Sequence, residues 1–187
     1  MYNFGFDIDD VIFKTSEVLM KVLDECDDDE ILKHKLDIMR GDAVNKKIGD
    51  FLKENVIPAI KAAKPMKNAS QVIKKIKESN RIILITARGD KLFPSSEEIT
   101  ITLLKKYGIE YDDIIFNCMD KVKICKDYDI KLFVDDSPKH CLEVRDSLKI
   151  TVLGFYSDIN REEMLRKHIN CVSSWNELYN VVRKILK

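Results

Sequence analysis

The stretch Phe6-Asp-Ile-Asp-Asp-Val-Ile12 decides the fold, because it places a cluster of carboxylates directly after an apolar run that begins at Tyr2. Residues 81–86 (Arg-Ile-Ile-Leu-Ile-Thr) and 130–135 (Ile-Lys-Leu-Phe-Val-Asp) repeat this arrangement, each closing on one polar residue. None of these runs alternates between apolar and polar residues. They are therefore typical of parallel strands that are buried on both faces.

Two further short strands are predicted at 113–117 and 150–154, which gives five strands in all. Between them, apolar residues recur at helical spacing in 69–79, 96–107 and 137–147, and a closing helix begins at Trp175. Pro138 suits a first helical turn, and Ser137 is expected to cap that helix. Strands that alternate with helices predict an α/β fold, a Rossmann-like doubly wound parallel sheet.

Residues 14–67 interrupt this alternation. The segment contains no convincing strand, and its apolar residues recur at helical spacing, as in Val18, Leu19, Val22 and Leu23. We predict a small helical cap at 14–67, inserted after the first strand of a core domain formed by 1–13 and 68–187. Ligands of open α/β sheets bind beyond the carboxyl ends of the strands, so an insertion there is placed to act as a lid.

The composition limits the partners. The 32 basic and 32 acidic residues cancel, which argues against a stable nucleic-acid partner. No apolar run approaches the roughly 20 residues of a membrane span, and the first residues do not resemble a signal peptide. We expect a cytoplasmic protein without a membrane partner, and a homodimer stays open. The five cysteines include no Cys-x-x-Cys pair, so neither a zinc cage nor a disulfide framework is indicated.

Three predicted strands end in polar residues that could form one site: Asp7 and Asp9, then Thr86, then the pair 135–136 (Asp-Asp). Neighbouring parallel strands lie about 5 Å apart, so these side chains could converge. Carboxylates gathered there would repel one another unless a cation is bound. Oxygen ligands favour Mg²⁺, which commonly uses one or two carboxylates together with a substrate phosphate.

These motifs resemble those of the haloacid dehalogenase superfamily. Residues 6–12 resemble its first motif, Asp-x-Asp after a hydrophobic strand, and 83–86 (Ile-Leu-Ile-Thr) resemble its second. Residues 132–136 (Leu-Phe-Val-Asp-Asp) resemble the fourth. The third motif is a lysine ahead of the last strand, for which Lys121 is the first choice and Lys123 the alternative. The four motifs occur in the correct order along almost the whole chain.

The resemblance implies a role for each carboxylate. Asp7 would attack phosphorus and become an aspartyl phosphate, with one oxygen on Mg²⁺. Asp9 would protonate the leaving alcohol and then activate water, while its backbone carbonyl binds the metal. Asp135 would be a direct Mg²⁺ ligand, and Asp136 would act directly or through water. An acid at Asp9 marks phosphatases and phosphomutases within the superfamily, since both must protonate an alkoxide.

The resemblance also implies a phosphate site and one departure from the pattern. Thr86, Ala87 and Lys121 would hold phosphoryl oxygens. Asp10 stands where Gly is frequent and Val11 where Thr is frequent. Asp10 could be a further metal ligand, but we expect its side chain to turn outward.

The function that the resemblance favours is a Mg²⁺-dependent phosphomonoester hydrolase acting on a small phosphorylated substrate. The insertion, the short chain and Thr86-Ala-Arg88 resemble bacterial relatives of the 5′(3′)-deoxyribonucleotidases, so a 5′-nucleotidase acting on (deoxy)nucleoside monophosphates comes first. The alternatives are a phosphatase of sugar phosphates or other small esters and a nucleic-acid 3′-phosphatase. A catalytically dead binding module would have lost Asp7, Asp9 or the metal acids, and all are retained.

Substrate contacts are harder to read from the sequence. The candidates, each with surface solvation or core packing as its alternative, are Arg88, Lys91, Phe13, Arg40 and Phe51. The three histidines have no metal-ligand spacing, so we expect surface or packing roles for His34, His140 and His168.

Overall fold

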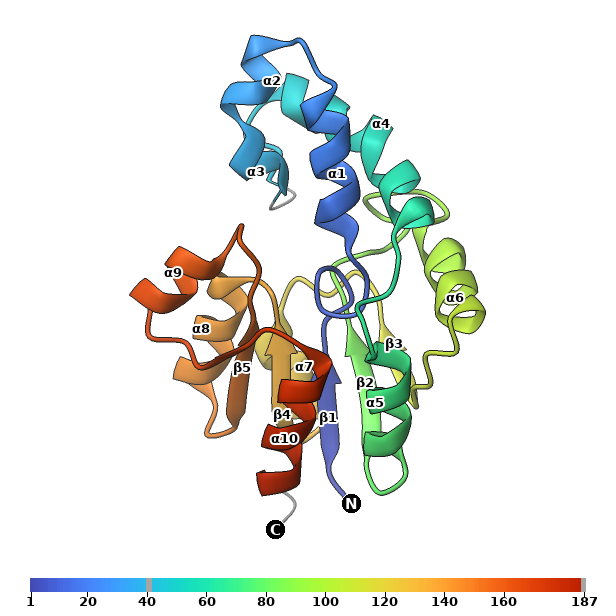
Figure 1. Ribbon diagram of the computed structural model, residues 1–187, viewed down its shortest axis with the longest axis vertical. Helices are drawn as coiled ribbons and strands as arrows, with labels where there is room; N and C mark the ends of the chain where they lie inside the picture. The colour runs from blue at the N-terminus through green and yellow to red at the C-terminus, as the bar shows by residue number, and fades with distance from the viewer. Residues whose placement is uncertain (40–41, 186–187) are drawn as a thin grey trace.

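A computed structural model describes residues 1–39 and 42–185 of the 187-residue chain (Figure 1). Its centre is one six-stranded sheet in the order β3-β2-β1-β4-β5-β6, in which every neighbouring pair of strands is parallel. The strands are β1 (Asn3–Phe6), β2 (Arg81–Ile85), β3 (Asp113–Ile115), β4 (Ile130–Asp135), β5 (Thr151–Phe155) and β6 (Cys171–Val172). The predicted doubly wound parallel sheet is confirmed.

Helices cover both faces of the sheet, as Figure 1 shows. They are α5 (Ala69–Lys77), α6 (Ser96–Lys106), α7 (Lys121–Asp127), α8 (Pro138–Ser147), α9 (Arg161–Arg166) and α10 (Trp175–Ile185). In β2, Ile82 and Leu84 belong to the hydrophobic cluster that includes α5, α6 and α10. Ile83 and Ile85 belong to the cluster that includes α7, α8 and α9. This burial on both faces explains why the strands are continuously apolar.

The predicted count of five strands was wrong, because β6 was missed. β6 has only two residues, Cys171 and Val172, and is too short to give an apolar pattern. The helices α7 and α9 were not predicted either, since they have seven and six residues and so too few turns for a clear period. By contrast, Pro138 does begin α8, and the Ser137 side chain caps it by accepting a hydrogen bond from the His140 amide.

Residues 15–62 form the helices α1 (Thr15–Asp24), α2 (Asp29–Lys33), α3 (Lys35–Met39) and α4 (Lys46–Ala62). They lie beyond the carboxyl ends of the strands (Figure 1) and share a small hydrophobic cluster of their own, which contains Leu23, Ile48 and Leu52. The two chain segments that join this helical insertion to the sheet are held together, since the Lys14 amide donates to the Lys64 carbonyl at 2.9 Å. The insertion therefore stands over the sheet edge where the motif residues end.

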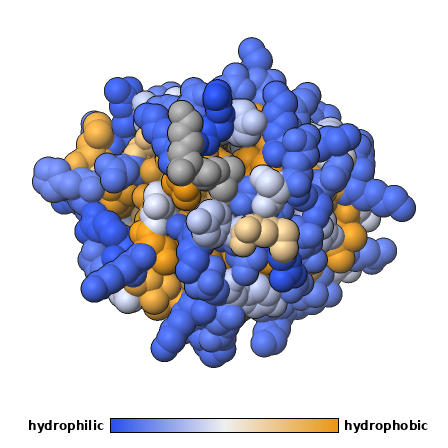
Figure 2. Space-filling view, turned by 90° about the horizontal axis from the view of Figure 1, so that it is seen from below, coloured by the Kyte–Doolittle hydropathy of each residue, from blue (hydrophilic) through white to orange (hydrophobic). Residues whose placement is uncertain are grey.

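The opposite face of the molecule carries the amino ends of the strands. Its surface is mainly hydrophilic, with small apolar areas between charged side chains (Figure 2). Within the described residues, no helix is long and apolar enough to cross a membrane.

Candidate active site

A tight loop after β1 carries Asp7 and Asp9. The Asp7 amide donates to the Val134 carbonyl at 2.9 Å, which holds Asp7 beside the end of β4. The amides of Ile12 and Phe13 both donate to the Ile8 carbonyl, at 2.9 and 3.0 Å, so the chain turns sharply after Asp9. The site therefore rests on a loop whose backbone groups are bonded to one another and to the neighbouring strand.

Helix α10 supports the same loop through its first residue, Trp175. The buried indole of Trp175 donates to the Val11 carbonyl at 2.8 Å, and its ring packs edge-on against Phe6 at 5.3 Å between centroids. A buried carbonyl that lacked this partner would cost free energy, so Trp175 stabilises the turn that presents Asp9.

Asp10 does not point outward as we expected. Its Oδ1 accepts a hydrogen bond from the Ser16 amide at 3.1 Å, in the first turn of α1. The backbone of Asp10 is left-handed, with φ of 51°, a conformation that Gly adopts freely and that Asp tolerates better than most residues. Asp10 thus ties the motif loop to the helical insertion, and this backbone conformation accounts for the Gly that is frequent at this place.

Lys121 lies at the centre of the site. It is the first residue of α7 and is 1% exposed. Its Nζ donates to Asp7 Oδ1 at 2.5 Å and to the Ile85 carbonyl, and it lies 3.6 Å from Asp135 Oδ2. Lys123 is exposed and pairs with Asp127. Of the two lysines that the sequence left open, only Lys121 lies beside Asp7.

The charges of this group oppose one another. Burial raises the pKa of Asp7 to about 6, an effect that Lys121 reduces and that Asp135 and Asp9 increase. Burial would lower the pKa of Lys121, but Asp7 and Asp135 outweigh it and hold that pKa above its ordinary value. Lys121 therefore stays protonated and makes an ionised Asp7 tolerable in a buried place.

Asp135 and Asp136 follow β4. Burial opposes ionisation of Asp135, yet Lys121 and His140 hold its pKa below the ordinary value. Asp135 Oδ1 accepts from the Ser137 amide at 2.8 Å, while its buried Oδ2 accepts no hydrogen bond from a described residue. Burial, and next the charge of Asp10, raise the pKa of Asp136 well above its ordinary value. This edge of the sheet carries more negative charge than Lys121 alone offsets.

His140 belongs to this group, although the sequence suggested only surface or packing roles. Its Nδ1 lies 3.3 Å from Asp135 Oδ2, and the attraction of that carboxylate raises the pKa of the imidazole against the opposing effect of burial. One signal could have identified it. A helix capped by Ser137 directly after the paired acids places its first turn, and hence residue 140, against the end of β4.

Thr86 and Arg88 follow β2. Thr86 is 1% exposed, and its amide donates to the Ile115 carbonyl at 3.0 Å, which fixes it beside β3. Ala87 follows and is half-buried. The Arg88 side chain is also buried and donates to both carboxylate oxygens of Asp9, from Nε at 2.9 Å and from Nη2 at 2.6 Å. Because of this pair, the pKa of Asp9 lies below its ordinary value even though burial raises it.

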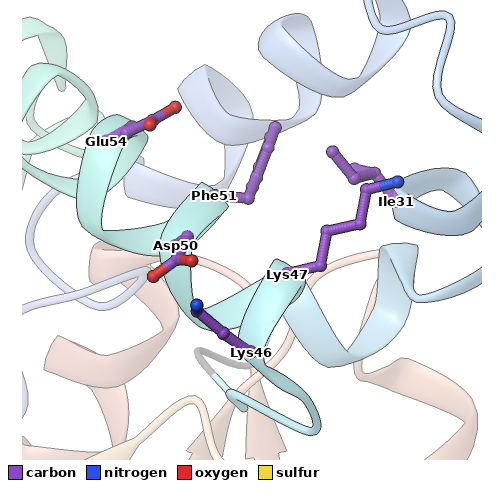
Figure 3. A pocket seen from close by; sticks show the side chains of 6 residues that line it. All are labelled: Ile31, Lys46, Lys47, Asp50, Phe51 and Glu54. Atoms are coloured by element: carbon purple, nitrogen blue, oxygen red, sulfur yellow. The ribbon is translucent and has the colours of Figure 1, made fainter.

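The other proposed substrate contacts are scattered. Phe13 is 0% exposed and packs against Tyr107, so no ring surface is left for a base. Phe51 belongs to the core of the helical insertion and lines a groove of about 450 Å³ there (Figure 3). The groove is formed by Ile31, Lys46, Lys47, Asp50, Phe51 and Glu54, and none of these is a strand-end residue. Lys91 is exposed, and Arg40 lies outside the described residues.

The site geometry agrees with the comparison to known families. The sequence profile described as 5′-nucleotidase matches residues 3–157, more than four fifths of the chain. The chain belongs to the 5′-nucleotidase family. The matched range contains all the strand-end residues described above as well as the helical insertion.

Individual relatives are more distant. A nucleotidase from Clostridium acetobutylicum is 28% identical over 123 residues, which are 65% of this chain and 60% of that protein. The chain therefore spans about three fifths of the length of that relative.

Solved structures show the same fold. A haloacid dehalogenase-like hydrolase from Streptococcus pneumoniae superposes with a TM-score of 0.68 at 12% identity, covering 97% of this chain and 98% of that one. A hydrolase of the same superfamily from Deinococcus radiodurans, solved with bound phosphate and sodium, gives a TM-score of 0.63 at 12% identity and covers 98% of this chain and 95% of that one. The fold of this member of the 5′-nucleotidase family is thus that of the haloacid dehalogenase-like hydrolases.

Proposed function

We propose that this protein is a Mg²⁺-dependent phosphomonoester hydrolase that works through an aspartyl phosphate and acts on nucleoside 5′-monophosphates. The observation that carries the proposal is the contact of Lys121 Nζ with Asp7 Oδ1 at 2.5 Å, deep in the site and beside Asp9. A buried lysine stabilises the carboxylate form of Asp7, and a carboxylate is the form that attacks phosphorus.

The first half-reaction transfers the phosphoryl group to the protein. An oxygen of Asp7 attacks phosphorus, and the bond from phosphorus to the alcohol oxygen breaks. Arg88 holds Asp9 as a carboxylate before substrate binds, so Asp9 first takes up a proton, which the nearby anionic phosphate favours; it then gives that proton to the departing oxygen and is left as a carboxylate again. We expect Lys121, whose Nζ contacts Asp7, and Thr86, which is buried directly after β2, to hold phosphoryl oxygens.

The second half-reaction releases phosphate. Asp9, now ionised, takes a proton from a water molecule as the water oxygen attacks phosphorus. The bond between phosphorus and Asp7 breaks and restores the starting carboxylate. A group that changes from acid to base in this way must face the reaction space, and the Asp9 side chain is 34% exposed while Asp7 is 9% exposed.

The donor set of the site fits Mg²⁺. Asp135 Oδ2 is buried and accepts no hydrogen bond from a described residue, although Lys121 Nζ and His140 Nδ1 lie 3.6 and 3.3 Å from it, and the charge of Asp135 acts on Asp7. Across 1–39 and 42–185, no three His, Cys, Asp or Glu side chains are arranged to hold a metal by themselves. A set made of Asp7, Asp135, the Asp9 carbonyl and waters, with Asp136 as a direct or water-mediated ligand, is nevertheless typical of Mg²⁺. The ion would neutralise charge on the phosphoryl oxygens.

The substrate class rests on the family. The 5′-nucleotidase profile covers the motif residues, and a nucleotidase is among the relatives. A screen of phosphate release should test it, with deoxynucleoside and ribonucleoside 5′-monophosphates, 3′-monophosphates, sugar phosphates and a 3′-phosphorylated oligonucleotide. We expect kcat/KM to be highest for a 5′-monophosphate. A higher value for a sugar phosphate or for the oligonucleotide would replace the nucleotide assignment and keep the phosphatase.

Removal of divalent cations should stop the reaction. Without a divalent cation, the negative charges of Asp7, Asp135, Asp136 and the substrate phosphate are not neutralised. We therefore expect excess chelator to lower turnover by about 100-fold, with recovery when Mg²⁺ is added back. The melting temperature should also rise with Mg²⁺ concentration, since an ion that binds only the folded chain stabilises it. Full turnover in chelator, together with an unchanged melting temperature, would contradict the metal site.

A further inference from the structure

The buried Arg88 side chain is held by hydrogen bonds to three other side chains. It is 4% exposed as a residue. Its Nε and Nη2 donate to the two oxygens of Asp9 at 2.9 and 2.6 Å, and Nη1 donates to Thr100 Oγ1 at 3.0 Å. Nη2 donates again to Thr15 Oγ1 at 3.1 Å. A guanidinium offers five N–H donors in a rigid fork, and almost all of them are directed at described side chains.

These contacts come from three separate elements. Thr100 lies on α6, Thr15 begins α1, and Asp9 lies on the loop after β1. The guanidinium carbon also lies 5.9 Å from the centre of the Phe13 ring, which limits movement on that side. The fork is therefore fixed before any substrate arrives, and the carboxylate that it holds has a fixed plane.

Building on the proposed function, we propose that Arg88 is a positioning residue that acts through Asp9. Two hydrogen bonds from one planar group set the orientation of the Asp9 carboxylate. Each Asp9 oxygen accepts one bond from Arg88, so a proton that Asp9 gives to the leaving oxygen or takes from water must lie on the side of an oxygen that Arg88 does not occupy. Arg88 also faces the negative charge that appears on Asp9 when the proton leaves. Thr100 and Thr15 hold the fork in place.

The competing role is direct binding of the substrate phosphate by Arg88. This role would require the guanidinium to release both oxygens of Asp9 and the hydroxyls of Thr15 and Thr100. Arg88 would also have to leave a buried position, whereas Lys121 already contacts Asp7. The two roles differ in which kinetic constant Arg88 controls.

A double-mutant cycle separates them, using Arg88→Met, Asp9→Asn and the double variant. Each is assayed on deoxynucleoside 5′-monophosphates, whose alkoxide needs a proton, and on p-nitrophenyl phosphate, whose leaving group needs little. We expect Arg88→Met to lower kcat on the nucleotide by roughly 10- to 100-fold, to lower it far less on the aryl ester, and to change KM less than about threefold. In the Asp9→Asn background, Arg88→Met should have almost no further effect on kcat.

Two further variants complete the design. Arg183→Met, which removes an exposed arginine on α10, is the matched control for the loss of charge. Arg88→Lys keeps the charge but not the fork and should still lose most of the nucleotide activity. If Arg88→Met does not fold, Arg88→Lys replaces it in the double-mutant cycle with Asp9→Asn.

An increase in KM of similar size on both esters, additive with Asp9→Asn, would overturn the proposal in favour of phosphate binding. Full activity of Arg88→Lys would also overturn it. Failure of the proposed function would look different, because it would appear in the wild-type chain: a protein that is not a phosphatase would hydrolyse neither ester, and a phosphatase of another substrate would hydrolyse only the aryl ester well.

Discussion

Asp7→Asn is expected to abolish turnover, by a factor on the order of 10⁴ or more, on activated and natural esters alike. The amide keeps the shape of the side chain, but it cannot form the bond to phosphorus. We expect no other carboxylate to take over this role, because among the described residues only the Asp7 carboxylate accepts a hydrogen bond from Lys121 Nζ. Rapid acid quenching after mixing with radiolabelled substrate should trap a phosphoprotein from wild type and none from the variant.

Asp129→Asn is the matched control for this change. The Asp129 side chain is 79% exposed and pairs only with Lys131 among the described residues. The variant therefore makes the same chemical change at a surface position outside the site. Its activity should equal that of wild type. Labelled phosphoprotein formed by Asp7→Asn would show that another residue is the nucleophile, and Asp9 would be the first to examine.

Much of the site could be predicted because its residues sit at strand ends. A buried parallel strand is continuously apolar, so the first polar residue marks where it leaves the core, as at Asp7, Thr86 and Asp135. Parallel strands all finish at one edge, and this brings residues far apart in the sequence together. The structure places Lys121, Asp7 and Asp135 within hydrogen-bond or ion-pair distance at that edge.

The remaining features depend on tertiary contacts that leave no local pattern. Lys121 and Lys123 are two residues apart and differ only in which helical position faces the sheet. The Asp120 side chain caps α7 by accepting from the Lys123 amide at 2.9 Å, and this start of the helix turns Lys121 inward. Arg88 meets Asp9 across 79 residues of sequence. No periodicity or propensity could have shown that pairing.

Lys121→Met should have the second-largest effect on turnover, a loss on the order of 10³-fold. The variant removes the one cation that contacts Asp7 in the described part of the chain and that also faces Asp135. Without it, the nucleophile is harder to ionise and the phosphoryl oxygens lose a positive partner. Because Lys121 is 1% exposed, breaking its ion pair should also lower the free energy of unfolding by about 3–5 kcal/mol near pH 8.

The loss of stability should depend on pH in a defined direction. In the wild-type chain the pKa of Asp7 is about 6, above its ordinary value of 3.8, so the folded state binds more protons than the unfolded state between these values. Its contribution to stability therefore falls as the pH rises through that window and is constant above it. Lys121 lowers this pKa, so the pKa of Asp7 is higher in Lys121→Met. The pH range over which stability falls therefore extends further upward in the variant, and its stability at pH 8 is lower.

Urea unfolding in the presence of chelator should consequently show Lys121→Met much closer to wild type at pH 5 than at pH 8. The double variant Asp7→Asn/Lys121→Met should regain stability at pH 8, because it removes the buried anion that the single variant leaves without its partner. Lys123→Met is the matched control, since that lysine lies on the same helix and its solvent-exposed pair with Asp127 contributes little to stability. A destabilisation of Lys121→Met that was equal at pH 5 and pH 8, and unchanged by Asp7→Asn, would mean that Lys121 supports the fold through its packing and not through its charge.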